Sequence, residues 1–293
     1  MTFWQLTVPA SAETSDGLTN FLWEHGALGV VEEEFPGEPP RLLAFFPETA
    51  SSTGLLGAVN AYRASLRSLG FRVSSDSPAI TPLFDGDWAH AWQQSFPPIE
   101  VGRLQIVPPW EAREDRDADA RLQVIIEPGR AFGTGHHGST EGCLALIEEG
   151  LRAPGDPVLD IGTGTGILAI AAVKLGAPSA LAIDVDADAI AAARANADRN
   201  GCADRITFVL GGPEILAPGQ RFRLVVANLL AHTHLGLVAR YGEIVAPGGL
   251  LVLGGILAEE QGRVTDALPS AAFEPAALRV VDGWASLLIR RCP

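Results

Sequence analysis

The chain contains little of several residue types, and each shortage argues against a class of protein. Its 293 residues include three cysteines, Cys143, Cys202 and Cys292, which are far apart and form no C-x-x-C pair. They therefore predict no disulfide framework. Glycine, proline or a charged residue interrupts every apolar run, so we expect no transmembrane helix and no membrane partner. The first residues lack the charged start and apolar block of a signal peptide, and we expect a cytoplasmic protein.

Basic residues are also scarce. Lys174 is the only lysine, and 21 basic residues stand against 35 acidic ones, giving a formal net charge of −14. Double-stranded nucleic acid repels such a surface unless a local basic patch compensates, and no basic run is visible. We therefore expect no direct nucleic-acid partner. A basic protein would be attracted, although acidity also serves simply to keep a protein soluble.

The first 75 residues have the pattern of a small α+β domain. Helices are predicted at 11–25 and 53–69, and strands at 3–8, 28–34, 41–46 and 71–75. The order βαββαβ fits a ferredoxin-like domain, which either positions a partner or is a structural appendage. Residues 76–121 are predicted to be a linker, with a short helix at 87–96 that carries Trp88 and Trp92 on one face.

From residue 122 to residue 293 strands and helices alternate, which predicts a parallel sheet covered by helices. Strands are expected at 158–161, 180–184, 207–210, 224–228 and 250–254, and helices at 167–175, 187–200 and 235–245. The tail differs, because segments 277–281 and 285–290 flank Asp282-Gly283, a hairpin turn signal. Five parallel strands and a terminal antiparallel hairpin predict the α/β fold of class I methyltransferases, which is Rossmann-like with seven strands. An NAD-binding Rossmann domain would continue with a sixth parallel unit.

A glycine-rich turn follows the first of these strands. Residues 158–166 read Val-Leu-Asp-Ile-Gly-Thr-Gly-Thr-Gly and lead directly into a helix, whose first N–H groups can face a polar ligand. A dinucleotide fingerprint, G-x-G-x-x-G, would need glycine where Ile167 stands. Gly162, Gly164 and Gly166 instead form G-x-G-x-G, which resembles the first motif of S-adenosylmethionine-dependent methyltransferases.

Two polar residues end the second and fourth strands of the predicted sheet, at the edge where such sheets bind ligands. Asp184 lies 18 residues after Gly166 and can accept hydrogen bonds from both hydroxyls of a ribose, which fits NAD and S-adenosylmethionine equally. Asn228 is followed by Leu229-Leu230. Amino-group methyltransferases of nucleic acids carry Pro-Pro-aromatic there, so the leucines argue against a base as substrate. Capping of the strand end is the structural alternative for Asn228.

Several segments together resemble one bacterial family. They are the loop Glu127-Pro-Gly-Arg-Ala-Phe-Gly-Thr-Gly-His-His-Gly-Ser-Thr140, the glycine motif, Asn228-Leu-Leu-Ala, and Pro247-Gly-Gly-Leu-Leu-Val-Leu-Gly-Gly-Ile-Leu257. This pattern is similar to PrmA, the methyltransferase family of large-subunit ribosomal protein L11. The resemblance covers nearly the whole chain, and the Phe-Gly-Thr-Gly loop is its most specific part. It implies that residues 1–75 recognise the substrate and that residues 122–293 bind S-adenosylmethionine and catalyse.

The resemblance also implies roles for single residues. The positions that match the family's cofactor contacts are Thr140, Gly162, Gly164, Asp184 and Asn228, and Phe132 belongs to the loop that closes over the methionine end. That loop usually reads Phe-Gly-Thr-Gly-Thr-His-Pro-Thr-Thr. Here His136, Gly138 and Ser139 replace Thr, Pro and Thr, and the loss of proline should loosen the loop. Ser139 or Thr140 is the expected cap of the next helix.

After the third strand, Gly211-Gly212-Pro213 stands where an acidic residue is more usual in the family, which leaves the adenine contacts open. Four histidines are expected on loops near the site, namely His136, His137, His232 and His234. Imidazoles so placed could bind a metal, but surface positions or substrate contacts are the more ordinary roles, and no metal is expected.

The expected function is therefore protein N-methylation. Methyl groups would pass from S-adenosylmethionine to lysine side-chain or α-amino groups of L11, a basic protein substrate. No residue is required to be a general base, and Asn228 is the candidate that positions the amine. Two alternatives stay open: a related lysine methyltransferase with another protein target, and a protein that binds S-adenosylmethionine without transferring its methyl group.

Overall fold

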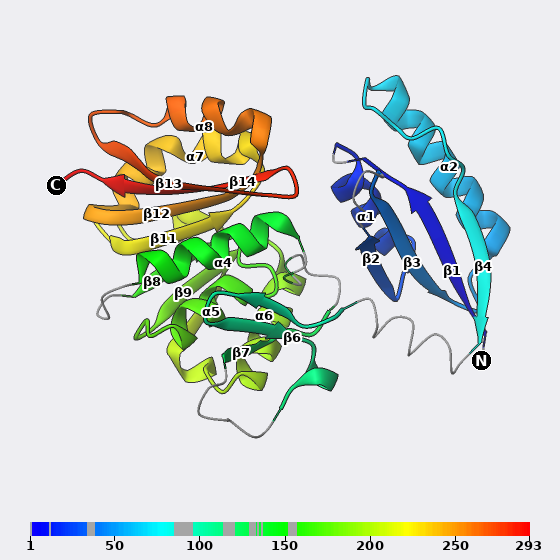
Figure 1. The fold of residues 1–293 in the computed structure, drawn as a ribbon, viewed down its shortest axis with the longest axis horizontal. Coiled ribbons are helices and arrows are strands. Elements are labelled where there is room, and N and C mark those ends of the chain that lie inside the picture. Colours follow the sequence, from blue (N-terminus) through cyan, green and yellow to red (C-terminus); the bar gives the residue numbers. More distant parts are fainter. Residues whose placement is uncertain are drawn as a thin grey trace. The chain divides into compact units, whose positions relative to one another are not determined.

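The computed structural model describes residues 2–11, 13–33, 39–84, 96–113, 121–128, 133, 135, 137–151 and 157–293. The chain forms two compact units, Met1–Pro97 and Pro98–Pro293 (Figure 1). Within the described ranges, no helix combines the length and the apolar character needed to cross a membrane. The helix expected at 87–96 lies almost entirely outside the described residues.

The first unit is a four-stranded antiparallel sheet with two helices. Its strands are ordered β2-β3-β1-β4, the arrangement of a ferredoxin-like domain, as the sequence predicted. Alternate strand residues such as Leu6, Ala44 and Phe46 are buried against Leu18 and Leu22 of α1. The elements are β1 (Thr2–Pro9), α1 (Ser15–Glu24), β2 (Gly29–Glu33), β3 (Arg41–Pro47), α2 (Ser52–Ser68) and β4 (Ala79–Phe84).

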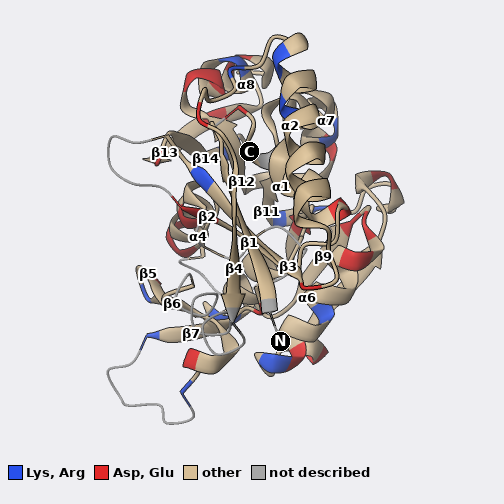
Figure 2. Ribbon diagram, turned by 90° about the vertical axis from the view of Figure 1, so that its right-hand side faces the viewer, with Lys and Arg blue, Asp and Glu red and all other residues tan. Residues whose placement is uncertain are grey.

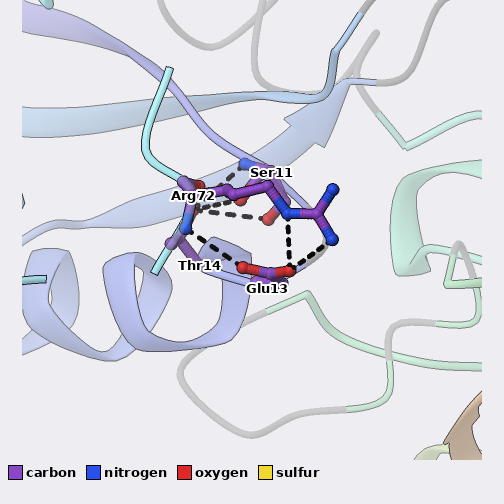
Figure 3. Close-up of polar contacts among 4 residues, drawn as sticks. All are labelled: Ser11, Glu13, Thr14 and Arg72. Atoms are coloured by element: carbon purple, nitrogen blue, oxygen red, sulfur yellow. Dashed lines mark hydrogen bonds and ion pairs between the residues drawn. The ribbon is translucent and has the colours of Figure 1, made fainter. Parts of the chain in front are cut away.

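The strand expected at 71–75 is wrong, because the fourth strand is β4. Side chains occupy the backbone groups that a strand would pair. Ser11 Oγ donates to the Arg72 carbonyl at 2.8 Å, and the Glu13 carboxylate accepts from Arg72 N and Nε, each at 3.1 Å (Figure 3). The guanidinium of Arg63 donates to the Ser74 carbonyl at 2.9 Å. The sheet therefore extends past residue 75, the expected boundary.

The second unit contains a seven-stranded sheet ordered β10-β9-β8-β11-β12-β14-β13. The first five are parallel, and β14 runs antiparallel between β12 and β13, so the predicted parallel strands and terminal hairpin are confirmed. A small second sheet, β5-β6-β7, covers part of the range expected to be linker. The strands are β5 (Ile99–Val101), β6 (Leu104–Val107), β7 (Leu122–Ile125), β8 (Val158–Ile161), β9 (Ala180–Asp184), β10 (Ile206–Leu210), β11 (Phe222–Asn228), β12 (Val245–Leu257), β13 (Phe273–Val281) and β14 (Trp284–Arg291).

Helices cover both faces of the large sheet, so its central strands are apolar on both sides. In β8, Val158 packs with α4, α5 and α6, whereas Leu159 packs with α7 and α8. Figure 1 shows α4 and α7 on opposite sides of the sheet, and in Figure 2 the charged residues lie mainly on helices and loops. The helices are α4 (Gly138–Gly150), α5 (Ile167–Lys174), α6 (Ala187–Arg199), α7 (Ala231–Ile244) and α8 (Gln261–Ala267), with short 3-10 turns at Pro109–Glu111, Ala203–Arg205, Pro213–Ile215 and Ala258–Glu260.

The β13–β14 hairpin turns at Asp282-Gly283, as predicted. Both residues have positive φ, 48° and 80°, which is the geometry of a type I′ turn. A Cβ added at Gly283 would meet no atom within 4 Å, so only the backbone conformation makes glycine preferable there. The hairpin determines the register of the two strands that complete the sheet.

We expect Gly283→Ala to lower the free energy of unfolding by about 1–2 kcal/mol, because alanine is strained in the left-handed region. Gly242→Ala is the matched control, since Gly242 lies in α7 without positive φ and its added Cβ would also meet nothing. That substitution should stabilise the protein by up to about 1 kcal/mol. Urea denaturation followed by tryptophan fluorescence measures both, and equal effects would contradict the assignment of the turn.

Candidate functional site

The glycine turn between β8 and α5 forms the floor of the candidate site. Gly162, Gly164 and Gly166 all have positive φ, at 71°, 54° and 83°, which side-chain-bearing residues rarely adopt. The Gly162 and Thr163 N–H groups donate to the Ile183 carbonyl of β9 at 2.9 and 3.1 Å. These hydrogen bonds fix the turn to the neighbouring strand β9. Because the three glycines have no side chains, none of them covers the backbone of the turn.

Asp184 ends β9 beside this turn. Its Oδ2 accepts from Gly164 N at 2.9 Å, and its Oδ1 accepts from Asp186 N at 3.0 Å. The side chain is partly exposed, and each carboxylate oxygen can accept more than one hydrogen bond. Asp184 therefore connects the turn to β9 and still presents acceptors at the carboxyl edge of the sheet.

Asn228 ends β11 at the same edge and contacts α4. Its Nδ2 donates to Thr140 Oγ1 at 3.3 Å, and Thr140 itself is buried. Its Oδ1 is buried and has no hydrogen-bond partner among the described residues. A Cβ added at Gly254 would lie 2.9 Å from this oxygen, so glycine leaves room for the amide. An unsatisfied buried acceptor is costly, and this one could accept a hydrogen bond from a ligand.

Asp160 lies beneath the turn, in β8, and is fully buried. Its Oδ2 accepts from Thr163 Oγ1 at 2.7 Å and from Ala169 N at 3.2 Å, whereas Oδ1 has no partner among the described residues. Burial raises the pKa of this carboxyl to about 7; the two hydrogen bonds oppose that shift, and the nearby Asp184 charge adds to it.

Two glycines of the loop at 127–140 lie against the turn. The Gly133 carbonyl accepts from Thr165 Oγ1 at 2.6 Å. Gly135 has a φ of 98°, and an added Cβ would lie 2.9 Å from Ile106 and 3.4 Å from Ile167. Phe132 and His136 lie outside the described residues.

The start of α4 differs from the expectation. His137, rather than Ser139 or Thr140, caps the helix: its Nδ1 accepts from Ser139 N at 3.4 Å and lies 2.7 Å from Ser139 Oγ. The His137 ring packs 4.4 Å from that of Trp284, and burial lowers its pKa to about 4. A neutral imidazole suits this position, because a capping atom must accept hydrogen bonds.

The other described histidines also have ordinary partners. His234 is buried in α7, where Nδ1 accepts from Tyr241 Oη and Nε2 donates to the Gly254 carbonyl, both at 2.8 Å. His232 is exposed and lies 3.3 Å from Thr233 Oγ1. Among the residues the structure describes, no three His, Cys, Asp or Glu side chains gather as metal ligands do.

Sequence reasoning missed two asparagines that hold the candidate site together, one in α6 and one at its C-cap. Asn196 accepts from Glu127 N at 3.0 Å and donates to the Thr165 carbonyl at 3.0 Å. Asn200 accepts from Ile125 N at 2.9 Å and donates to its carbonyl. They join the end of β7 to the glycine turn. The available signal was their i, i+4 spacing on an otherwise alanine-rich helix.

The chain is similar to several known proteins. The family model described as "Ribosomal protein L11 methyltransferase (PrmA)" matches residues 2–292. Curated proteins of that name are similar, one from Marinobacter nauticus at 37% identity over 92% of this chain and 91% of its own. Another, from Thermus thermophilus, is 36% identical over 98% and 100%. The crystal structure of a ribosomal protein L11 methylase from Lactobacillus delbrueckii subsp. bulgaricus superposes with a TM-score of 0.60 at 33% identity, covering 67% of this chain and 99% of that one.

The burial of His234 predicts how its protonation affects stability. An unfolded histidine takes up a proton as pH falls through about 6.5, whereas folded His234 stays neutral until about pH 4 because burial lowers its pKa. Its contribution to stability is therefore complete above pH 6.5 and is lost as pH falls toward 4. Between about pH 7 and about pH 5, the wild type should lose about 2 kcal/mol more than His234→Gln.

Urea denaturation at the two pH values measures this difference, and His137 cancels because both proteins contain it. Parallel pH profiles for the wild type and the variant would show that His234 is not held neutral by its surroundings.

Proposed function

Since the chain belongs to the ribosomal protein L11 methyltransferase (PrmA) family, we propose that it transfers methyl groups from S-adenosylmethionine to amino groups of L11. The enzyme is thus an S-adenosylmethionine-dependent protein methyltransferase. The observation that carries the proposal for the site is the meeting of three features at one sheet edge: the glycine turn, the Asp184 carboxylate on Gly164 N, and the buried, unpartnered Asn228 Oδ1.

The residues present fit this cofactor. Asp184 offers acceptors for the two ribose hydroxyls, and the backbone of Gly162 and Gly164 can lie directly against the cofactor. Thr140 and Asn228 lie at the neighbouring strand end, and Asn228 retains an acceptor with nothing to bind. The loop of Phe132 adjoins the turn through Gly133 and Gly135 and would close over the methionine end. When bound, S-adenosylmethionine supplies an electrophilic methyl group on a positively charged sulfur.

The reacting amine must be neutral to attack. A free lysine has a pKa near 10.4, so its deprotonation at pH 7 costs about 4.6 kcal/mol, which desolvation and a nearby positive charge reduce. Asn228 Oδ1 can accept an N–H hydrogen bond and hold the nitrogen lone pair toward the methyl group, and such positioning accounts for much of the acceleration. No side chain need act as a general base if the proton passes to solvent.

The charge of the protein supports a basic partner. With a net charge of −14, the surface attracts a basic protein such as a ribosomal protein and repels nucleic acid. The expected target is therefore a protein rather than an RNA. The ferredoxin-like unit would recognise that substrate. A ribosomal substrate also supports a cytoplasmic location, with no membrane partner.

Incubation with labelled S-adenosylmethionine and a whole-cell extract tests the proposal. A single labelled band at L11 is expected, with methylated lysine or α-amino groups identified by mass spectrometry. Labelling of another protein would indicate a different target. Binding of S-adenosylmethionine without labelling would indicate a protein that does not transfer the methyl group.

Asn228→Ala should lower kcat/KM for L11 by about ten- to a hundredfold, which is the effect of losing one buried hydrogen bond. The control variant Thr140→Ser keeps the hydroxyl and should keep most of the activity.

A matched pair of aspartates tests the cofactor site. Asp184→Asn should weaken S-adenosylmethionine binding about tenfold or more, because an amide cannot accept from two hydroxyls as a carboxylate does. Asp188→Asn removes the same charge from the first turn of α6, where the backbone N–H of Asp188 donates to the N-cap residue Asp186. The Kd of the Asp188→Asn variant for S-adenosylmethionine should change less than about twofold. Equal effects in isothermal calorimetry would mean that only the acidic field matters.

A further inference from the structure

The carboxyl group of Asp160 is buried in an arrangement that does not balance a negative charge. It is fully buried, and both of its hydrogen bonds, from Thr163 Oγ1 and Ala169 N, go to one oxygen. The other oxygen, Oδ1, has no partner among the described residues. A carboxylate oxygen without a donor is far more costly in the interior than the corresponding neutral hydroxyl.

The groups packed around Asp160 also fail to supply a positive charge. The end of β9 contributes another carboxylate, Asp184, which disfavours ionisation of Asp160. α4 contributes the thiol of Cys143, whose pKa burial raises to about 12, so it stays neutral. α5 contributes only the backbone N–H of Ala169 at its first turn, and β11 contributes apolar side chains such as Val226. Within the described part of the chain, no basic side chain pairs with Asp160.

We propose that, at and below neutral pH, Asp160 carries a proton in a large fraction of the cofactor-free enzyme and releases it to water when the positively charged methyl donor binds above the glycine turn. The inference rests on the proposed function and assigns a further residue to the same site. In the free enzyme the protonated carboxyl of Asp160 is neutral. Of the two carboxyl groups beneath the turn, only Asp184 then carries a negative charge. On binding, the positive charge of the donor offsets both carboxylates, the O–H bond breaks heterolytically, and the proton passes to solvent.

This coupling makes the enzyme discriminate between donor and product. S-adenosylmethionine and S-adenosylhomocysteine share the α-amino and α-carboxyl groups, and the donor carries one additional positive charge at sulfur. Ionised Asp160 therefore favours the donor, whereas the neutral thioether product allows the carboxyl to take up its proton again. Loss of the sulfur charge on transfer therefore weakens the retention of the product.

Calorimetry of ligand binding in two buffers with different ionisation enthalpies counts the protons released. With the carboxyl half-protonated near pH 7, donor binding should release up to about half a proton there, falling toward zero near pH 9. The product should release distinctly less at each pH. The comparison of donor with product cancels the ligand's own α-amino group, which titrates near pH 8. From about pH 6 to about pH 8 the preference for donor over product should rise by up to about tenfold.

Two variants identify the group responsible. Asp160→Asn cannot titrate, so the difference in proton release and the pH dependence of the donor preference should both disappear. Thr163→Val removes the hydroxyl that stabilises the charged form, so the maximum of proton release should move to higher pH instead of disappearing. The second variant keeps the inference testable if Asp160→Asn does not fold.

The failures of the two proposals are distinguishable. If neither ligand bound the purified protein, the proposed function itself would fail. If the donor bound and methylated L11 but released no more protons than the product, or if Asp160→Asn released as many as the wild type, the role of Asp160 alone would be overturned.

Discussion

The close approach of backbone to backbone at the glycine turn is the constraint on which the site depends. Gly162, Gly164 and Gly166 occupy the left-handed region, and the turn is fixed to Ile183 of the adjacent strand. Only that conformation brings Gly164 N onto the Asp184 carboxylate. A side chain at these positions would impose backbone strain, and at Gly162 and Gly166 its Cβ would also collide with Leu229 and Ala193. The geometry of the edge therefore follows from three missing side chains.

The same edge concentrates polar groups that the fold leaves incompletely satisfied. Asn228 Oδ1 and Asp160 Oδ1 are both buried without partners among the described residues, although native proteins pair most such atoms. Other buried polar groups of the second unit, residues 98–293, have hydrogen-bond partners. Asn196 forms hydrogen bonds through both its amide oxygen and its amide nitrogen, and His234 forms them through both ring nitrogens. The unsatisfied atoms therefore lie at the proposed ligand site, and the satisfied ones support the scaffold around it.

The confirmed predictions are those that depend on patterns within a few neighbouring residues. The strands β8 and β9 were located to the residue, because turns and glycines delimit apolar runs, and Asp282-Gly283 determined the hairpin. The prediction of a strand at 71–75 failed because the side chains of Ser11, Glu13 and Arg63 bind that backbone, and no local sequence pattern indicates such contacts. The sequence analysis also missed the cap of α4 and the roles of Asn196 and Asn200, because no local sequence pattern indicates those contacts. The assignments of Asp184 and Asn228 required the family resemblance, since neither residue type identifies its ligand.

The departures of the 127–140 loop from its family pattern argue less for an inactive protein than the sequence suggested. Glycine replaces the usual proline at 138, but an added Cβ there would lie 2.5 Å from the Val281 carbonyl, so the hairpin packs against the helix start. His137 then supplies the cap that Ser139 or Thr140 was expected to provide. The first turn of α4 is thus held by the hairpin and by the neutral imidazole, which keeps Thr140 beside Asn228. These contacts hold the start of α4 in place although the loop departs from the family pattern.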